Sequence, residues 1–337
     1  MMAIDHGAKT GAPFARGSVS LRLYPHNELD AGGVVNELCT QARLGLDAGF
    51  DGIMTSEHHG GVGGYIPNPF QMASFVLEDS AVGWTAACPL LLPLRPTALV
   101  AEEAAWLAAR HPGRVGLGVA AGAMELDFTS MGLELADAVP SFKRELASIV
   151  AMLQGRNLRG LDEDRALQQC KVSPIPVLSA AVSLTAARRA AACGAGILLE
   201  GMSSVEKVSA MCKAFDDEGG TGSKVLVRRV WLGQPRSEAV ANQRRFYETN
   251  GPAANAFPED QTVVSSEPAE LAERIVAIQD QAGVDAINLR VHLPGLSAPA
   301  IREQIVALGT EVLPVIRHLA QGSLSGGGTT QERGTVR

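Results

Sequence analysis

Apolar residues recur along this chain in two alternating rhythms. Short apolar runs bounded by glycine, proline or polar residues predict strands, and apolar residues at every third or fourth position predict helices. The predicted strands cover residues 19–24, 51–55, 82–88, 114–119, 175–178, 197–199, 225–232 and 285–290. The predicted helices cover residues 35–46, 69–77, 96–109, 142–153, 184–193, 204–218, 236–248, 268–281 and 299–319.

Strands that alternate with helices throughout favour a parallel sheet. The simplest closure of these strand–helix units is an α/β fold of the (β/α)₈ TIM-barrel type, with an open doubly wound sheet as the alternative. A polar stretch at residues 233–266 predicts an insertion after the seventh strand. We expect a disordered leader at residues 1–17, a single barrel domain at residues 18–320 and a disordered Gly/Ser/Thr-rich tail at residues 321–337.

Composition narrows the class of protein. The chain has 337 residues and is 46% hydrophobic, which is ample for a large core. Its net charge is −7 without long charged runs, so we expect neither a nucleic-acid partner nor an anionic membrane partner. No signal peptide and no membrane-length apolar run is evident. Five scattered cysteines without a C-x-x-C pair are typical of reduced thiols in a cytoplasmic protein.

The string Glu57-His58-His59 ends the second predicted strand. Active sites of TIM barrels lie at the carboxyl ends of the strands, and histidine exchanges protons near neutral pH. The string is therefore either an acid–base site or a polar cap on the strand. Adjacent residues of an extended chain point in opposite directions, and no spaced ligand set is evident, so we expect no metal site.

The fourth predicted strand leads into a run of small residues. Residues 114–122 contain a GxGxxA string, which in isolation is compatible with a dinucleotide-binding turn. The residues after it do not open a helix. We therefore interpret Ala120 and Gly122 as a strand end at which a planar ligand approaches the backbone closely.

Further polar residues follow other strands. Hydroxyls between the fifth-strand region and the next helix are either a phosphate seat or ordinary helix caps; they are Ser179, Ser183 and Thr185. Five more residues are expected to line the same mouth of the barrel, namely His26, Cys88, Glu200, Arg290 and His292. Two residues that precede the fourth strand belong at the opposite face and are interpreted as structural, namely His111 and Arg114.

Several strings, in this order and spacing, resemble the bacterial luciferase-like, flavin-dependent monooxygenases from residue 19 to residue 319. They are Gly49–Ile53 running into Glu57–His59, Leu92–Pro96 with Ala101–Glu103, Pro112–Gly118, Phe128–Gly132 and Glu311–Arg317. The resemblance implies a TIM barrel that binds FMN at its C-terminal face and forms a homodimer through its second and third helices. It also implies that reduced FMN, supplied by a separate flavin reductase, reacts with O₂ to give a C4a-peroxyflavin that oxygenates a small organic substrate.

The resemblance also implies roles for individual residues. His58 lies beside the flavin and assists proton transfer, with Glu57 orienting it or its neighbours. A non-proline cis peptide falls near three residues that flank the flavin, namely Ala86, Ala87 and Cys88. Residues 123–139 and 250–267 are expected to form lids over the site.

This sequence departs from luciferase itself. Ala120 and Ala121 stand where the light-emitting enzyme carries a reactive cysteine and a phosphate-binding arginine. Light emission is therefore not implied, and we expect loosely bound FMN whose phosphate relies on the fifth-strand loop or on a more distant cation. Two alternatives stay open: a deazaflavin-dependent hydride-transfer enzyme of the same fold, and a non-catalytic flavin-binding protein.

Overall fold

The computed structural model describes residues 11–61, 65–250 and 262–325. Within these ranges, strands β1 to β7 and β9 pair side by side in parallel, and the pairings of β6 with β7 and of β1 with β9 close the ring. The strands are β1 Val19–Arg22, β2 Gly52–Thr55, β3 Trp84–Leu91, β4 Val115–Ala120, β5 Val177–Ala181, β6 Gly196–Leu199, β7 Lys224–Leu232 and β9 Ala286–Arg290. The predicted TIM barrel is confirmed, because a closed ring excludes the open sheet.

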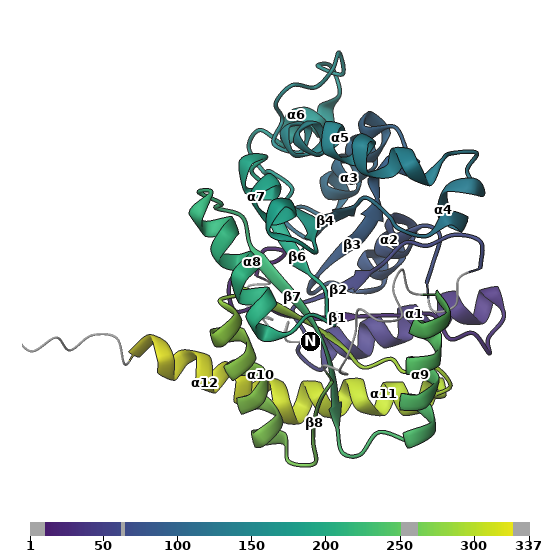
Figure 1. Cartoon of the computed structure of the whole chain (residues 1–337), viewed down its shortest axis with the longest axis vertical. Helices are drawn as coiled ribbons and strands as arrows, with labels where there is room; N and C mark the ends of the chain where they lie inside the picture. Colours follow the sequence, from purple (N-terminus) through teal and green to yellow (C-terminus); the bar gives the residue numbers. More distant parts are fainter. Residues whose placement is uncertain (1–10, 62–64, 251–261, 326–337) are drawn as a thin grey trace, which may run out of the picture.

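Helices surround the barrel on all sides of the view in Figure 1, with α3, α5 and α6 on one side and α10, α11 and α12 opposite. The longer helices are α1 Ala31–Asp47, α2 Pro69–Asp79, α3 Thr97–Arg110, α5 Ala138–Met152, α7 Leu184–Ala192, α8 Val205–Asp217, α10 Pro268–Ala282, α11 Ala298–Ala307 and α12 Leu313–Ser325. Short helices α4 Glu125–Thr129 and α6 Arg165–Gln169 lie in the connections, and a π-helical turn at Leu308–Val312 joins α11 to α12. None of the helices in the described ranges is long and apolar enough to span a bilayer.

The insertion after β7 holds two elements, α9 Ser237–Asn250 and β8 Val263–Ser265. β8 was not predicted from the sequence; it pairs with the end of β7 alone, with Val230 opposite Val263. It therefore lengthens the sheet beyond the ring without joining it. Of the lid expected at residues 250–267, residues 251–261 lie outside the described part of the chain.

The inside of the barrel is filled at one end and polar at the other. Phe14 is wholly buried and meets Trp84 edge to face at 5.1 Å between ring centroids. Gly116 makes room for it, since a Cβ there would lie 2.7 Å from the Phe14 ring. Phe14 thus closes the N-terminal end, which leaves the C-terminal end for ligands.

The two chain ends differ from the sequence-based expectation where they are described. Residues 11–17 fall in the expected leader, yet Gly17 donates from its backbone N–H to the Asp285 carbonyl at 2.7 Å and Arg16 pairs with the Asp285 carboxylate. At the other end α12 continues to Ser325, past the expected start of the tail. Residues 1–10 and 326–337 lie outside the described ranges.

Candidate active site at the ends of strands β2 to β4

Glu57 is a buried carboxylate at the end of β2 that is held by three donors. It accepts hydrogen bonds from the Leu91 backbone N–H at 2.6 Å, from Arg95 at 2.5 Å and from Nε2 of His59 at 3.0 Å. Residues two apart on an extended chain face the same way, which explains why Glu57 meets His59 and not His58. Glu57 therefore contacts His59, the neighbour of His58, and not His58 itself.

Asp127 on α4 orients His58. Its wholly buried carboxylate lies 2.7 Å from Nδ1 of His58 and accepts the His59 backbone N–H at 2.7 Å. A neutral His58 ring that donates its Nδ1–H to this carboxylate keeps its lone pair on Nε2. The His58 side chain is 19% exposed, and the Tyr65 ring packs against it edge to face at 4.3 Å. The arrangement leaves Nε2 as the nitrogen that can exchange a proton with a ligand.

The small-residue strand β4 makes room for protein side chains. A Cβ on Gly118 would lie 2.1 Å from Sγ of Cys88, so this glycine makes room for that thiol. Burial raises the pKa of the Cys88 thiol to about 11, against the opposing charge of Arg22, so the thiol stays protonated. The residues left partly exposed at the strand end are Ala120, Ala121 and Gly122.

The cis peptide expected after strand three is present in a different form. In the described ranges the cis bond is the X-Pro bond Cys88–Pro89, so the expectation of a non-proline cis peptide near Ala86, Ala87 and Cys88 is wrong in type and close in position. The carbonyl of Cys88 accepts a hydrogen bond from Arg22 at 2.9 Å.

The remaining cofactor candidates separate by the side of the strand on which they lie. Ala86 packs inside the barrel, whereas Ala87 packs in the layer between strands and helices. Ser179 is paired with Val119 and Ile197, which both belong to that outer layer, so its side chain also faces the helices.

The hydroxyls beyond β5 are not gathered into one anion seat. Ser183 caps α7 by accepting the Ala186 backbone N–H at 3.2 Å, which is the helix-capping alternative. Thr185 is exposed on the first turn of the same helix. The structure thus does not bring Ser179, Ser183 and Thr185 together around one point.

Among the other mouth candidates, Glu200 accepts from the Met202 backbone N–H at 2.7 Å and from Oγ of Ser203 at 2.5 Å, so it shapes the loop after β6. Arg114 donates to three carbonyls at the opposite face, which confirms its structural interpretation. His111 lies 3.3 Å from Glu78, also at that face. No group of three or more potential metal ligands occurs among the described residues.

Comparison with known proteins adds the family. The sequence profile of the luciferase-like monooxygenases matches residues 18–286. This chain belongs to that family. A search of curated protein sequences finds no match.

Several solved structures have the same fold as this chain. A monooxygenase from Streptomyces bottropensis superposes with a TM-score of 0.72 at 17% identity, covering 88% of this chain and 99% of its own. The oxygenating constituent of 3,6-diketocamphane monooxygenase from Pseudomonas putida, solved with FMN, gives 0.70 at 17% identity, covering 90% and 99%. An F420-dependent secondary alcohol dehydrogenase gives 0.64 at 13% identity, covering 89% and 99%.

Proposed function

We propose that this protein is an FMN-dependent monooxygenase that uses reduced FMN and O₂ to oxygenate a small organic substrate. The observation that carries the proposal is the His58–Asp127 pair, a histidine with a fixed tautomer and a partly exposed ring at the C-terminal end of a luciferase-like barrel. Membership of the family and the FMN complex of the diketocamphane enzyme support the choice of cofactor.

The residues at the end of β4 suit a flat heterocycle. Ala120, Ala121 and Gly122 are small and partly exposed, so a ring can lie against the backbone there. Phe128 supports Gly122 from behind, since a Cβ on this glycine would lie 2.8 Å from the phenyl ring. When bound, reduced FMN supplies the electrons that activate O₂.

The protein's own contribution is to position one proton and to exclude water. Asp127 holds the His58 ring so that Nε2 accepts or returns a proton at the reacting group, a kind of help worth about 100- to 10,000-fold in rate. Glu57 and Arg95 fix the chain beneath it. Exclusion of water when the ligands bind strengthens each hydrogen bond in the site.

The proposal includes a reductase and a second copy of the chain. A separate flavin reductase supplies reduced FMN, as the resemblance to the luciferase-like family implies. Three large apolar side chains on α2 and α3 are exposed, namely Phe75 at 40%, Leu99 at 46% and Trp106 at 56%. Exposed apolar side chains of this size support a homodimer interface at these helices. The free state of all five cysteines supports a cytoplasmic location.

His58→Ala tests the proposal. We expect substrate oxygenation, followed as formation of the oxygenated product with a flavin reductase present, to fall about 100- to 10,000-fold while FMN still binds. Glu125→Gln is the matched control, because Glu125 is an exposed carboxylate on the same helix as Asp127. Unchanged oxygenation in the His58 variant would remove His58 from the mechanism.

A titration of the apoprotein separates the cofactor alternatives. FMN and a deazaflavin coenzyme are added in parallel, and tighter binding of FMN with O₂-dependent turnover supports the monooxygenase. Preferential deazaflavin binding, with hydride transfer that is independent of O₂, would replace it by the dehydrogenase alternative. Binding of FMN without turnover of any substrate would favour the non-catalytic flavin-binding alternative.

A further inference from the structure

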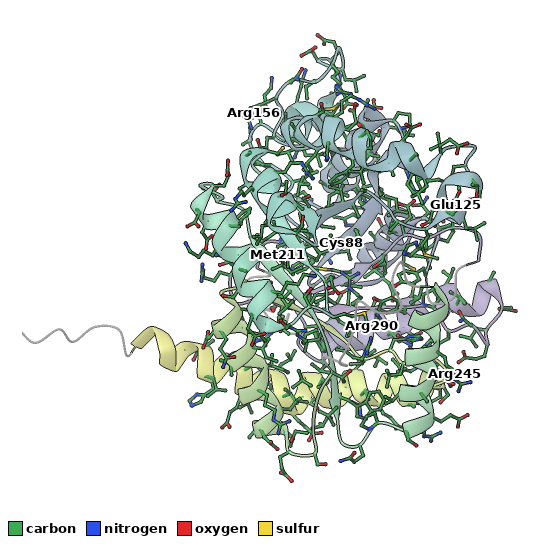
Figure 2. All side chains as sticks on the ribbon, viewed as in Figure 1. Cys88, Glu125, Arg156, Met211, Arg245 and Arg290 are labelled. Carbon is green, nitrogen blue, oxygen red and sulfur yellow. The ribbon has the colours of Figure 1, made fainter. Side chains whose placement is uncertain are left out.

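A cluster of cationic and aromatic side chains lies across the barrel mouth from β4. Arg22 and Tyr24 come from β1 and the loop after it, Arg229 from β7, and Arg290 and His292 from β9 and its end. All five residues are at least nine-tenths buried. In the closed ring β9 stands four strands from β4, so the cluster faces the small-residue strand end. Figure 2 shows Arg290 near the middle of the molecule, close to Cys88 in this view, while Glu125 lies toward the periphery.

Arg22 carries a buried positive charge among neutral partners. It donates to Oδ1 of Asn288 at 2.7 Å, to the Cys88 carbonyl at 2.9 Å and to Oγ of Ser56. Within the described part of the chain Arg22 is 3% exposed and forms no ion pair with a carboxylate. A buried cation without a counter-charge is unfavourable unless an anion joins it.

The cations of the cluster surround the ring of Tyr24. The guanidinium carbon of Arg290 lies 4.0 Å from the Tyr24 ring centroid. Burial alone would raise the pKa of Tyr24, but the charges of Arg290, Arg22 and Arg229 outweigh it and lower the pKa below its ordinary value. Three guanidinium groups therefore act on this one ring, although the chain as a whole has a charge of −7.

His292 supplies a polar atom that has no hydrogen-bond partner among the described residues. Its ring stacks on Tyr24 at 5.5 Å between centroids and meets His26 edge to face at 5.4 Å. The residue is 8% exposed, and its buried Nδ1 makes no hydrogen bond within the part of the chain that the structure describes. A buried ring nitrogen in that state is costly, and a ligand oxygen beside it would remove the cost.

A row of aromatic rings connects this cluster to His58. Tyr24 contacts Tyr65 edge to face at 5.3 Å, and Tyr65 in turn contacts His58 at 4.3 Å. Tyr24 and Tyr65 therefore form a continuous row of rings between His292 and His58. Aromatic walls of this kind suit a small, largely apolar body.

We propose that the cluster of Arg22, Arg290 and His292 is a substrate subsite that binds the oxyanion group of a small organic acid, such as a carboxylate, with the reacting carbon directed along Tyr24 and Tyr65 toward His58. Its assignment to the substrate rests on the function proposed above, whereas anion binding as such does not. A charge-assisted hydrogen bond from a planar guanidinium to a carboxylate is the recognition that this geometry offers.

The test uses the full chain without flavin and pairs each anion with a neutral analogue of the same shape. Benzoate is compared with benzamide and acetate with acetamide, with affinities measured by calorimetry. We expect at least one anion to bind about 10-fold or more tightly than its neutral analogue, and Arg290→Gln and His292→Gln each to weaken that binding about 10- to 100-fold. Arg317→Gln is the charge-matched control and leaves it unchanged, because Arg317 lies at the opposite end of the barrel against Gly49 and Asp51.

Three results would overturn the subsite. One is equal binding of every anion and its neutral analogue. A second is a loss of anion affinity in Arg317→Gln as large as in Arg290→Gln. The third result concerns the FMN phosphate, which is another source of an oxyanion. If Arg290→Gln weakens the binding of FMN but not of riboflavin, and if FMN displaces benzoate, the cluster binds the cofactor and not the substrate.

The test separates this inference from the proposed function. Selective anion binding with no FMN binding would refute the function and leave the anion site standing. FMN-dependent turnover without selective anion binding would do the reverse. If circular dichroism shows that Arg290→Gln does not fold, His292→Gln carries the comparison, because it removes the unpartnered nitrogen without touching a guanidinium.

Discussion

Asp127→Asn is the sharpest perturbation of the site, because it changes one charge and almost no volume. The native carboxylate accepts two hydrogen bonds of 2.7 Å, one from Nδ1 of His58 and one from the His59 backbone N–H. An asparagine oxygen can still accept the backbone bond. Its amide nitrogen then faces Nδ1 of His58, and two donors meet unless the His58 proton moves to Nε2.

The size of the effect follows from these contacts. A hydrogen bond to a charged group contributes about 1.5–3 kcal/mol, so Asp127→Ala, which removes both bonds, lowers the free energy of unfolding by about 3 kcal/mol or more. Asp127→Asn keeps one weaker bond and costs about 1–2 kcal/mol. Because the proton on Nε2 removes the free lone pair, turnover falls in the Asn variant about as far as in His58→Ala, about 100- to 10,000-fold.

Urea denaturation and ¹⁵N NMR of the histidine rings measure both parts of this prediction. Glu125→Gln on the same short helix is the control and changes stability by less than about 0.5 kcal/mol, since its side chain is exposed. A double-mutant cycle of Asp127→Asn with His58→Ala isolates the coupling between the two side chains. Equal urea midpoints for the Asp127 and Glu125 variants, together with an unchanged His58 tautomer, would refute the reasoning.

Three further predictions concern the same end of the barrel and its pH response. Glu57→Gln breaks the buried ion pair with Arg95 and lowers the free energy of unfolding by about 3 kcal/mol. Glu103→Gln removes a partly exposed carboxylate near the same arginine and lowers it by less than about 1 kcal/mol, and urea denaturation compares the two variants. Burial, reinforced by neighbouring positive groups, holds the pKa of His292 well below its ordinary value, so below pH about 6.5 the unfolded chain gains a proton that the folded chain does not. The free energy of unfolding therefore decreases as the pH falls, by up to about 1.4 kcal/mol per pH unit from this group, and His292→Gln flattens the curve; identical curves would contradict it. Gly118→Ala forces a methyl group against Sγ of Cys88 and costs about 1–3 kcal/mol in thermal unfolding, and an unchanged midpoint would show that this contact relaxes freely.

The fold could be predicted from periodicity because each strand and helix of a TIM barrel carries its own local signal. Gly49 precedes a strand and Gly283 ends a helix, and both have a positive φ, +107° and +70°. Few residues other than glycine adopt this backbone conformation, so these glycines mark the element boundaries in the sequence. β8 escaped because a strand of three residues in a polar insertion has no measurable alternation. The packing of Phe14 escaped as well, since a single aromatic residue in a Gly/Ala-rich segment does not reveal its contact.

The site was predictable to the extent that its residues follow strand ends. Glu57 and His58 do so, and so do Arg290 and His292. Asp127 does not: in sequence it lies two residues from Glu125, and nothing local distinguishes the buried carboxylate from the exposed one. Its role depends on how the connection after β4 folds back over β2, and such a long-range contact has no signal in one sequence.

The barrel can close only after nearly the whole chain has been synthesised, because its first strand pairs with its last. β1 is the first strand of the ring to leave the ribosome and β9 is the last. Arg22 on β1 therefore pairs with Arg290 on β9 only when synthesis has passed β9. At about 5–20 residues per second, β1 is exposed for many seconds with one edge unpaired, a state that favours aggregation. Any fragment that ends before β9 leaves that edge of β1 unpaired, together with the edge of β7 that pairs with β9. The nascent chain therefore loses these two aggregation-prone edges only when β9 pairs with β1 and β7.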